Sequence, residues 1–316
     1  MKKSKKTAIF AAFAVLACAT VHAAANPDEL LLQAVREMNL DSLNNAIRQG
    51  ANPNCMDTSD KSALMYACEN QWNIGIKILL TTPGINVSQK NTAGQNAVMY
   101  AVKHCDNEVV LKQILGDGTV NKNDTDNVGN TVLMYAIENK SGTPVDLLLK
   151  DGADPSKVNR DGYDALMWAA KNKNGYATKR ILDSSSYINW SQCDIKNENN
   201  AFMIACENGS LDIVRTMITG NNAFDPCWKN SKGQPSLIWL IDTRKSPNII
   251  AYLMEYCKPD IILSMEDDFG NDVEYYATIK NNTSVLKKLE EIERTLEIAR
   301  QKQEEKRANR AKERNR

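Results

Sequence analysis

Apolar positions along the chain follow a period that predicts pairs of short helices. In residues 129–155 the apolar side of a first helix is formed by Val132, Leu133, Tyr135, Ala136 and Ile137, after Thr131 as the N-cap. A second helix is predicted to start at Thr143-Pro144 and to bury Leu147, Leu148 and Leu149, with Gly152 as its left-handed C-terminal cap. Two helices of this length cannot hide their apolar faces alone, so the unit needs neighbours.

The core of the first helix recurs along the chain. Its copies read SALMYAC, NAVMYAV, TVLMYAI, DALMWAA, NAFMIAC, PSLIWLI and, degraded, DVEYYAT, and they begin at Ser62, Asn96, Thr131, Asp164, Asn200, Pro235 and Asp272. Matching positions are 33 to 37 residues apart. A period of this size indicates an array of stacked repeats.

These copies resemble the T-P-L-H-x-A-A motif of ankyrin repeats. Gly50-Ala51-Asn52 and Gly152-Ala153-Asp154 resemble the family's approach to the hairpin, and GSLDIVRTMI from Gly209 resembles its second helix. The resemblance covers about Asp28 to Leu289. It implies an all-α solenoid of stacked helix pairs with short hairpin loops. The family's histidine is methionine in five copies, so packing must replace its hydrogen bonds.

We expect one array at residues 26–289, with about seven to eight units and atypical terminal caps, followed by a charged helical tail at 290–316. Leu289, Ile292, Leu296 and Ala299 trace an apolar seam of under two heptads in the final helix. We interpret the tail as a solvated helix. A coiled-coil partner helix, or a basic end that touches lipid or nucleic acid, remains as an alternative.

Residues 1–23 have the features of a secretory signal. Four lysines precede the apolar run Ala8 to Ala17, and Val21-His22-Ala23 forms a small-residue cleavage site. We expect cleavage after Ala23 or an adjacent alanine. The alternative is a lipoprotein signal that is cut and acylated at Cys18, although Leu16 fits that motif poorly. An uncleaved anchor, or no export, also stays open.

Charge differs between the parts of the chain. The whole sequence has 39 positive and 39 negative side chains, and residues 287–316 hold 11 positive and 7 negative. Without that segment and the four signal lysines, the array has 24 positive and 32 negative. This excess of negative side chains argues against a nucleic-acid-binding face on the array and suits a basic or neutral protein partner. Membrane contact is expected only through a lipidated Cys18 or the basic tail.

Seven of the eight cysteines follow the signal. Cys68 and Cys206 occupy a tightly packed slot of the motif, where a small thiol is ordinary filler. Stacked helices lie about 8–10 Å apart, beyond the roughly 7 Å between Cα atoms that a disulfide spans. We therefore expect free, mostly buried thiols, with one adventitious bridge left open.

The sequence offers little for catalysis. His104 is the only histidine after the signal, which excludes a metal site with two histidines and leaves a Ser-His-Asp triad without a nucleophile motif. Phosphate-binding glycine loops are absent, and the acidic clusters lack calcium-loop spacing. We expect no enzymatic activity, no metal and no cofactor. We interpret the aromatic series Tyr66, Tyr100, Tyr135, Trp168 and Trp239 as core rather than as a ligand-binding stripe.

The resemblance implies that the hairpin tips and the exposed side of each first helix form one concave binding face. The candidate partner-binding residues are Arg160, Asp161, Tyr163, Asn127, Asn130, Glu138, Lys171, Glu198, Asn199 and Lys232. These positions vary from repeat to repeat while the scaffold positions recur, as expected if the scaffold residues maintain the fold and the variable residues contact a partner. For any single position the alternative is an ordinary polar loop residue.

Taken together, these patterns predict an exported, bacterial, periplasmic ankyrin-repeat protein that binds an unidentified protein and catalyses no reaction. Two alternatives from other classes remain. One is a lipid-anchored structural protein whose tail helix joins an oligomer. The other is an accessory or inhibitor protein that blocks the active site of a periplasmic enzyme.

Overall fold

The computed structural model describes residues 26–139, 141–184, 188–220 and 223–314, with side chains up to residue 307. The predicted signal, including Cys18, lies outside these residues. Seventeen helices and isolated β-bridges, but no strands, make up the regular structure of the described residues. This confirms the predicted all-α fold. The chain divides into two compact units, one ending at Asn127 and the other beginning at Val128.

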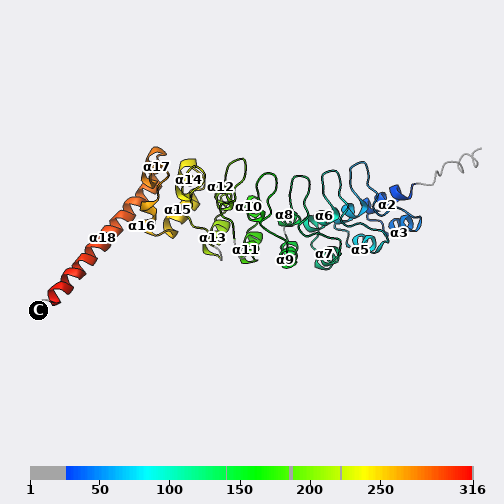
Figure 1. Ribbon diagram of the computed structural model, residues 1–316, viewed down its shortest axis with the longest axis horizontal. Coiled ribbons are helices and arrows are strands. Elements are labelled where there is room, and N and C mark those ends of the chain that lie inside the picture. The colour runs from blue at the N-terminus through cyan, green and yellow to red at the C-terminus, as the bar shows by residue number, and fades with distance from the viewer. Residues whose placement is uncertain (1–25, 140, 185–187, 221–222, 315–316) are drawn as a thin grey trace, which may run out of the picture. The chain divides into compact units, whose positions relative to one another are not determined.

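The first unit contains three helix pairs. They are α2 (Pro27–Arg36) with α3 (Leu40–Arg48), α4 (Ala63–Glu69) with α5 (Asn73–Thr81), and α6 (Ala97–His104) with α7 (Glu108–Leu115). First helices stack on first helices, α4 against α6, and second helices on second helices, α5 against α7. Figure 1 shows the loops that enter the first helices standing side by side. Each pair therefore buries an apolar face that it could not hide alone.

The second unit continues the same pattern. Its pairs are α8 (Val132–Ile137) with α9 (Thr143–Lys150), α10 (Ala165–Lys171) with α11 (Gly175–Ser184), α12 (Ala201–Glu207) with α13 (Leu211–Thr219), and α14 (Ser236–Thr243) with α15 (Pro247–Tyr256). A short additional helix, α16 (Pro259–Ser264), precedes the last pair, α17 (Val273–Ile279) with α18 (Thr283–Arg314). The sequence pattern did not predict α16.

Polar residues start the first helices as the sequence indicates. Thr131 Oγ1 accepts a hydrogen bond from the Met134 backbone N–H at 3.2 Å, and Asn96 Oδ1 accepts one from Met99 at 3.1 Å. These contacts satisfy donors that the helix itself leaves free. Met134 and Met99, which stand where the family has histidine, are buried. Packing therefore does replace the histidine's hydrogen bonds at these positions.

The second helix of the α8–α9 pair starts at Thr143 with Pro144 in its first turn, as predicted. Its buried side differs from the prediction, because Val145 and Leu148 are buried while Leu147 and Leu149 are only partly covered. Residues three apart share a helix face, whereas three consecutive leucines cannot. Gly152 has a φ of 85°, which confirms its left-handed capping role.

The final helix, α18, is both the second helix of the last pair and the charged tail. Val285, Leu289 and Ile292 are buried, and α16 and α17 pack against the helix. Beyond Ile292 the side chains are mostly exposed up to residue 307, and the helix continues unbroken to Arg314. None of the helices in the described parts is both long and apolar enough to cross a bilayer.

Candidate protein-binding surface

A tight turn held by an Asn or Asp side chain precedes six of the first helices, α4, α6, α10, α12, α14 and α17. Asn159 Oδ1 accepts hydrogen bonds from the backbone N–H groups of Asp161 at 3.0 Å and Tyr163 at 2.9 Å. Gly162 completes the turn with a φ of 84°, in the region that glycine adopts without strain. The turn therefore holds Arg160 and Asp161 at an exposed tip.

The same turn recurs before α17, where Asp267 is its anchor. Its carboxylate accepts hydrogen bonds from the backbone N–H groups of Phe269 and Asn271, both at 2.8 Å, and from the Tyr276 hydroxyl at 2.7 Å. Burial opposes the charged form of Asp267, but these bonds and one from the Asn271 amide outweigh it and lower the pKa to about 2. The Asp267 turn is thus held by a permanent anion at neutral pH.

Consecutive hairpins are joined through their backbones. In the second unit, the Arg160 N–H donates to the Val128 carbonyl and the Ile195 N–H to the Asp161 carbonyl, each at 2.9 Å. In the first unit, the Asn127 N–H donates to the Ala93 carbonyl at the same distance. These bonds fix the spacing of neighbouring tips, so the tip side chains form an ordered row within each unit.

Several hairpins also contact the end of their own first helix. Asn199 Nδ2 donates to Glu207 Oε2 at 3.1 Å, and Gln234 Nε2 to Asp242 Oδ2 at 3.1 Å. In both pairs the partners are eight residues apart. This second set of contacts holds the hairpin against the helix that follows it.

In the repeat of α10 the same relationship is between an aromatic ring and a cation. Lys171 Nζ lies 4.2 Å from the centre of the Tyr163 ring and 4.7 Å from that of Trp168, and the two rings meet edge to face at 5.8 Å. Such cation–π contacts favour a cation near the ring face. Burial raises the pKa of the Tyr163 hydroxyl, with nearby carboxylates adding to the effect. The Tyr163 hydroxyl therefore remains a neutral hydrogen-bonding group at physiological pH.

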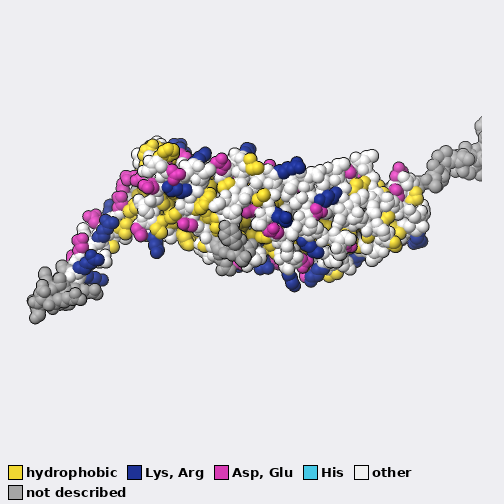
Figure 2. All heavy atoms as spheres, in the orientation of Figure 1, with side chains coloured by type: hydrophobic (Ala, Val, Ile, Leu, Met, Phe, Trp, Pro, Cys, Tyr) yellow, Lys and Arg dark blue, Asp and Glu magenta, His cyan; other side chains and the backbone are white. Residues whose placement is uncertain are grey.

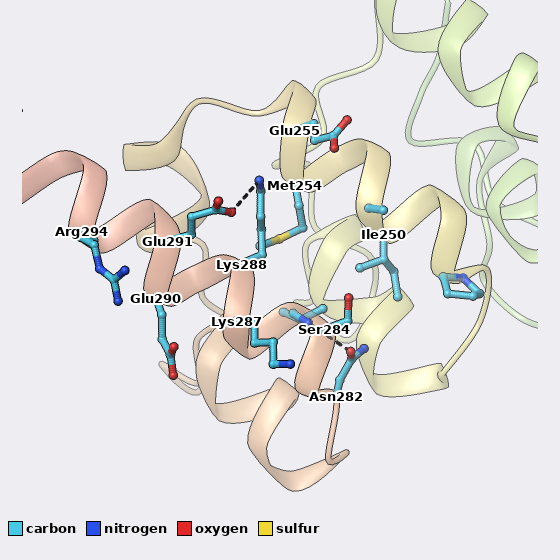
Figure 3. A pocket seen from close by; sticks show the side chains of 13 residues that line it. Ile250, Met254, Glu255, Asn282, Ser284, Lys287, Lys288, Glu290, Glu291 and Arg294 are labelled. Atoms are coloured by element: carbon cyan, nitrogen blue, oxygen red, sulfur yellow. Dashed lines mark hydrogen bonds and ion pairs between the residues drawn. The ribbon is translucent and has the colours of Figure 1, made fainter.

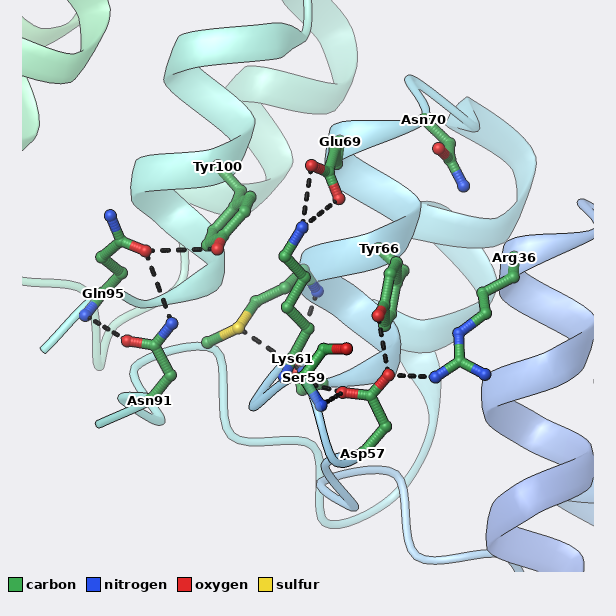
Figure 4. Close-up of polar contacts among 12 residues, drawn as sticks. Arg36, Asp57, Ser59, Lys61, Tyr66, Glu69, Asn70, Asn91, Gln95 and Tyr100 are labelled. Carbon is green, nitrogen blue, oxygen red and sulfur yellow. Dashed lines mark hydrogen bonds and ion pairs between the residues drawn. The ribbon is translucent and has the colours of Figure 1, made fainter. Parts of the chain in front are cut away.

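The first unit has a related arrangement, shown in Figure 4. Tyr66 donates its hydroxyl proton to Asp57 Oδ2 at 2.7 Å, and Arg36 from the preceding repeat pairs with the same carboxylate. Lys61 Nζ binds Glu69 at 2.7 Å and lies 5.3 Å from the Tyr66 ring and 5.5 Å from the Tyr100 ring. Cations thus alternate with aromatic rings along this part of the surface.

The core interpretation of the aromatic series is correct for only part of it. Tyr135 and Trp239 are buried, but Tyr66, Tyr100 and Trp168 are half-buried and reach the hairpin side. Lys61 lies over the rings of Tyr66 and Tyr100, and Lys171 lies over that of Trp168. The sequence pattern alone did not distinguish these two environments.

The candidate residues differ in how much they expose. Exposed members are Asn127, Arg160, Asp161, Lys171, Glu198 and Lys232, and half-buried members are Asn130, Glu138 and Tyr163. Asn199 is only 4% exposed, so it supports Glu207 rather than offering a surface of its own. Asn127 ends the first unit and donates to the Thr92 carbonyl at 2.6 Å.

The sequence analysis missed two apolar hairpin residues. Ile195 is 72% exposed and Phe269 is 86% exposed. The sequence does show them, because Ile195 directly follows the turn residue Asp194 and Phe269 lies two residues after Asp267, in turns where polar residues are expected. We define the hairpin face as the surface of the second unit formed by Arg160, Asp161, Tyr163, Lys171, Ile195 and Phe269. Figure 2 shows apolar side chains gathered over the end of the second unit near α17.

A separate groove of about 610 Å³ lies between α15 and α18, shown in Figure 3. Ile250, Met254 and Val285 contribute apolar side chains to it. On its rim Lys288 Nζ pairs with Glu291 Oε2 at 2.9 Å, and the remaining charges are of both signs. The rim therefore does not select a ligand of one charge.

Among the described residues, no group of three or more His, Cys, Asp or Glu side chains is placed to hold a metal ion. His104 lies in the last turn of α6, with its ring centre 6.3 Å from that of Tyr100.

Comparison with known proteins places the chain in a family. The family described as "Ankyrin repeats (3 copies)" matches residues 31–126, 75–159, 107–190 and 166–264, so the chain belongs to the ankyrin-repeat proteins. Ankyrin repeats are protein–protein interaction modules, and these matches indicate no enzyme family. The coarse expectation of a protein-binding role is therefore supported.

Curated relatives match over part of their length. The chain is 26% identical over 179 residues to human "Transient receptor potential cation channel subfamily A member 1", covering 55% of this chain and 16% of that protein. It is 25% identical over 172 residues to mouse "B-cell lymphoma 3 protein homolog", covering 54% and 38%. The chain therefore spans less than half the length of either relative, and the similarity concerns only the matched part of each.

A solved structure supports the same fold. The ankyrin repeat domain of Bcl-3, described as a unique member of the IkappaB protein family, matches with a TM-score of 0.55. The match is 23% identical and covers 66% of this chain and 91% of that domain. At this identity the likeness concerns the fold.

Proposed function

We propose that the protein is exported to the bacterial periplasm and there holds a partner protein against the hairpin face. The observation that carries this proposal is the exposure of Ile195 and Phe269 at hairpins whose backbones are rigidly held. Large apolar side chains at ordered tips have no structural role within their own repeat, and exposed apolar groups rimmed by polar ones are typical of interaction sites.

The neighbouring residues supply the other features of a binding surface. Arg160 is exposed beside the half-buried Tyr163, and Arg and Tyr are the residue types that most often anchor interfaces. The contact between Tyr163 and Lys171 orders both side chains before binding, so less conformational entropy is lost when a partner arrives. The array's negative charge favours a partner that is neutral or basic.

Capture of the partner tests this function. The mature chain is immobilised, exposed to periplasmic extract and washed, and retained proteins are identified by mass spectrometry. The matched control is a chain with Ile195→Ser and Phe269→Ser. We expect a protein that the wild-type chain retains and the double variant loses. Equal retention by both chains would contradict the hairpin-face proposal.

Export is tested separately by the mass of the protein isolated from cells. We expect a chain that begins after Ala23 or an adjacent alanine, which follows from the lysines, apolar run and small residues of 1–23. A chain that begins at Cys18 and carries acyl mass would support the lipoprotein alternative. An intact Met1 in the cytoplasm would contradict both.

A further inference from the structure

Side chains of five repeats reach the end of the preceding first helix. A backbone carbonyl near that helix end accepts a hydrogen bond from a side chain of the next repeat. The donor and acceptor pairs are Asn70 to Val35 at 3.3 Å, Cys105 to Cys68 at 3.4 Å, Asn174 to Ile137 at 2.8 Å, Asn208 to Ala170 at 3.1 Å, and Ser246 to Cys206. This position is therefore a recurring point of contact between consecutive repeats.

Between α4 and α6 the contact joins two cysteines. Cys68 lies in α4 and Cys105 is the C-cap of α6, and both are almost completely buried. Cys105 Sγ contacts the Cys68 carbonyl, and the side chains of the two cysteines also share a hydrogen bond. The hydrogen bond between the side chains raises the pKa of Cys68, as burial also does, and lowers the pKa of Cys105.

We infer that Cys68 and Cys105 form a disulfide that covalently joins the second and third repeats when the protein meets a small disulfide oxidant such as glutathione disulfide. The separation of stacked helix axes does not prevent this bond. Cys105 is at a helix end, in the slot whose side chain reaches across to the preceding repeat.

The chemistry is ordinary thiol–disulfide exchange. The Cys105 thiolate attacks one sulfur of glutathione disulfide, forms a mixed disulfide and releases one glutathione thiolate. The Cys68 thiolate then attacks the Cys105 sulfur and expels the second glutathione. Two cysteine thiols are oxidised, two glutathione molecules are produced, and the protons leave with the glutathione thiols. Because both sulfurs are buried, the first step requires transient opening of the turn after α6.

The second unit contains an equivalent contact between repeats that cannot form a disulfide. Cys206 occupies the position of Cys68 in the repeat motif, but Ser246 fills the donor slot opposite it. The hydrogen bond is preserved and the second thiol is missing. Cys105→Ser should therefore keep the link between repeats while removing the ability to form the disulfide.

The test uses the full mature chain equilibrated in a series of glutathione redox buffers. Free thiols are then alkylated under denaturing conditions, and the products are mapped by mass spectrometry. We expect one disulfide-linked peptide that contains Cys68 and Cys105, at a ratio of oxidised to reduced glutathione at which Cys206 remains alkylated. The Cys105→Ser and Cys68→Ala variants should lack it, whereas Cys206→Ala should retain it.

Urea unfolding shows whether the bond forms in the native arrangement. Oxidation should raise the wild-type midpoint, because the bond closes a segment whose ends are 37 residues apart and so restricts the unfolded chain. The same treatment should leave the Cys105→Ser midpoint unchanged, and reduced wild type and Cys105→Ser should unfold at similar urea concentrations. Full alkylation of Cys68 and Cys105 in every buffer, a different linkage, or an oxidised midpoint that does not rise would overturn the inference.

Discussion

Lys171 at the end of α10 lies directly over the ring of Tyr163, with its ammonium nitrogen 4.2 Å from the ring centre. The pair connects the hairpin to the helix that follows it, as the hydrogen bond between Asn199 and Glu207 does one repeat later. The Lys171 side chain therefore stabilises the scaffold and is also exposed to a partner. This dual use determines how substitutions on the hairpin face should be interpreted.

Removing the two anchors of the central hairpin should weaken partner binding. Arg160→Ala combined with Tyr163→Ala is expected to cost more than about 2 kcal/mol of binding free energy. Titration calorimetry against the captured partner measures this loss. Arg160→Ala alone should leave the melting temperature almost unchanged, because its side chain is exposed, whereas Tyr163→Ala should lower it slightly by removing contacts with Trp168 and Lys171.

The control for this experiment lies on a second helix. Lys179 in α11 is exposed, so Lys179→Ala should leave both affinity and stability unchanged. Its neighbour Arg180 is a poorer control, since its guanidinium Nε lies 2.6 Å from Asp146 Oδ1 in the preceding second helix. If Lys179→Ala abolishes binding while the hairpin pair does not, the partner uses the opposite side of the array.

Core and tail should respond differently to the loss of a leucine side chain. Leu133 is buried between helices, so Leu133→Ala should destabilise the protein by about 2–5 kcal/mol through the cavity that it leaves. Leu296 is only partly covered on the projecting part of α18, so Leu296→Ala should cost much less. Urea unfolding of the two variants compares them directly, and equal midpoint shifts would contradict the assignment.

Asp164 should make the protein less stable as pH rises from about 4 to 6. Burial raises the pKa of this N-cap carboxyl from its ordinary 3.8 to about 6, against the hydrogen bonds from the start of α10. The folded state then holds a proton that the unfolded state has lost. The stabilisation that comes from protonating Asp164 is therefore complete below the pKa of Asp164 in the unfolded state, and it is lost as pH rises through the pKa of Asp164 in the folded state.

The substitution Asp164→Asn tests this pH dependence. Asparagine keeps the capping acceptor, as Asn96 and Asn200 do in other repeats, and carries no charge to bury. We expect the variant to gain up to about 3 kcal/mol at pH 7 and to match wild type near pH 4. Unfolding free energies at several pH values provide the measurement. A variant that is less stable than wild type at pH 7 would show that the carboxylate stabilises α10.

The repeat scaffold was predictable because it depends on local patterns. Thr131 as a cap, Pro144 in a first turn and Gly152 in a left-handed cap each follow from backbone chemistry that one residue determines. The exposure of Arg160 and Lys232 at hairpin tips follows from the repeat register in the same way.

Features that depend on contacts between repeats were not predictable from the sequence pattern. The sequence gives no indication that Tyr66 is half-buried while Tyr135 is buried, because the exposure of each ring depends on the segments that pack around it in the folded array. The contact of Cys105 with Cys68 was missed for a similar reason. Distances between helix axes describe the middle of a stacked pair, whereas Cys105 caps the end of one.

The continuity of α18 gives the protein a mechanical property. The helix is 32 residues long, or about 48 Å, and no break separates its packed first turns from its projecting end. A pulling force applied near Arg314 is therefore transmitted along the backbone to Val285, Leu289 and Ile292 instead of being absorbed by a flexible linker. These three side chains would resist the load together, and their release would peel the terminal repeat away before the rest of its unit was disturbed.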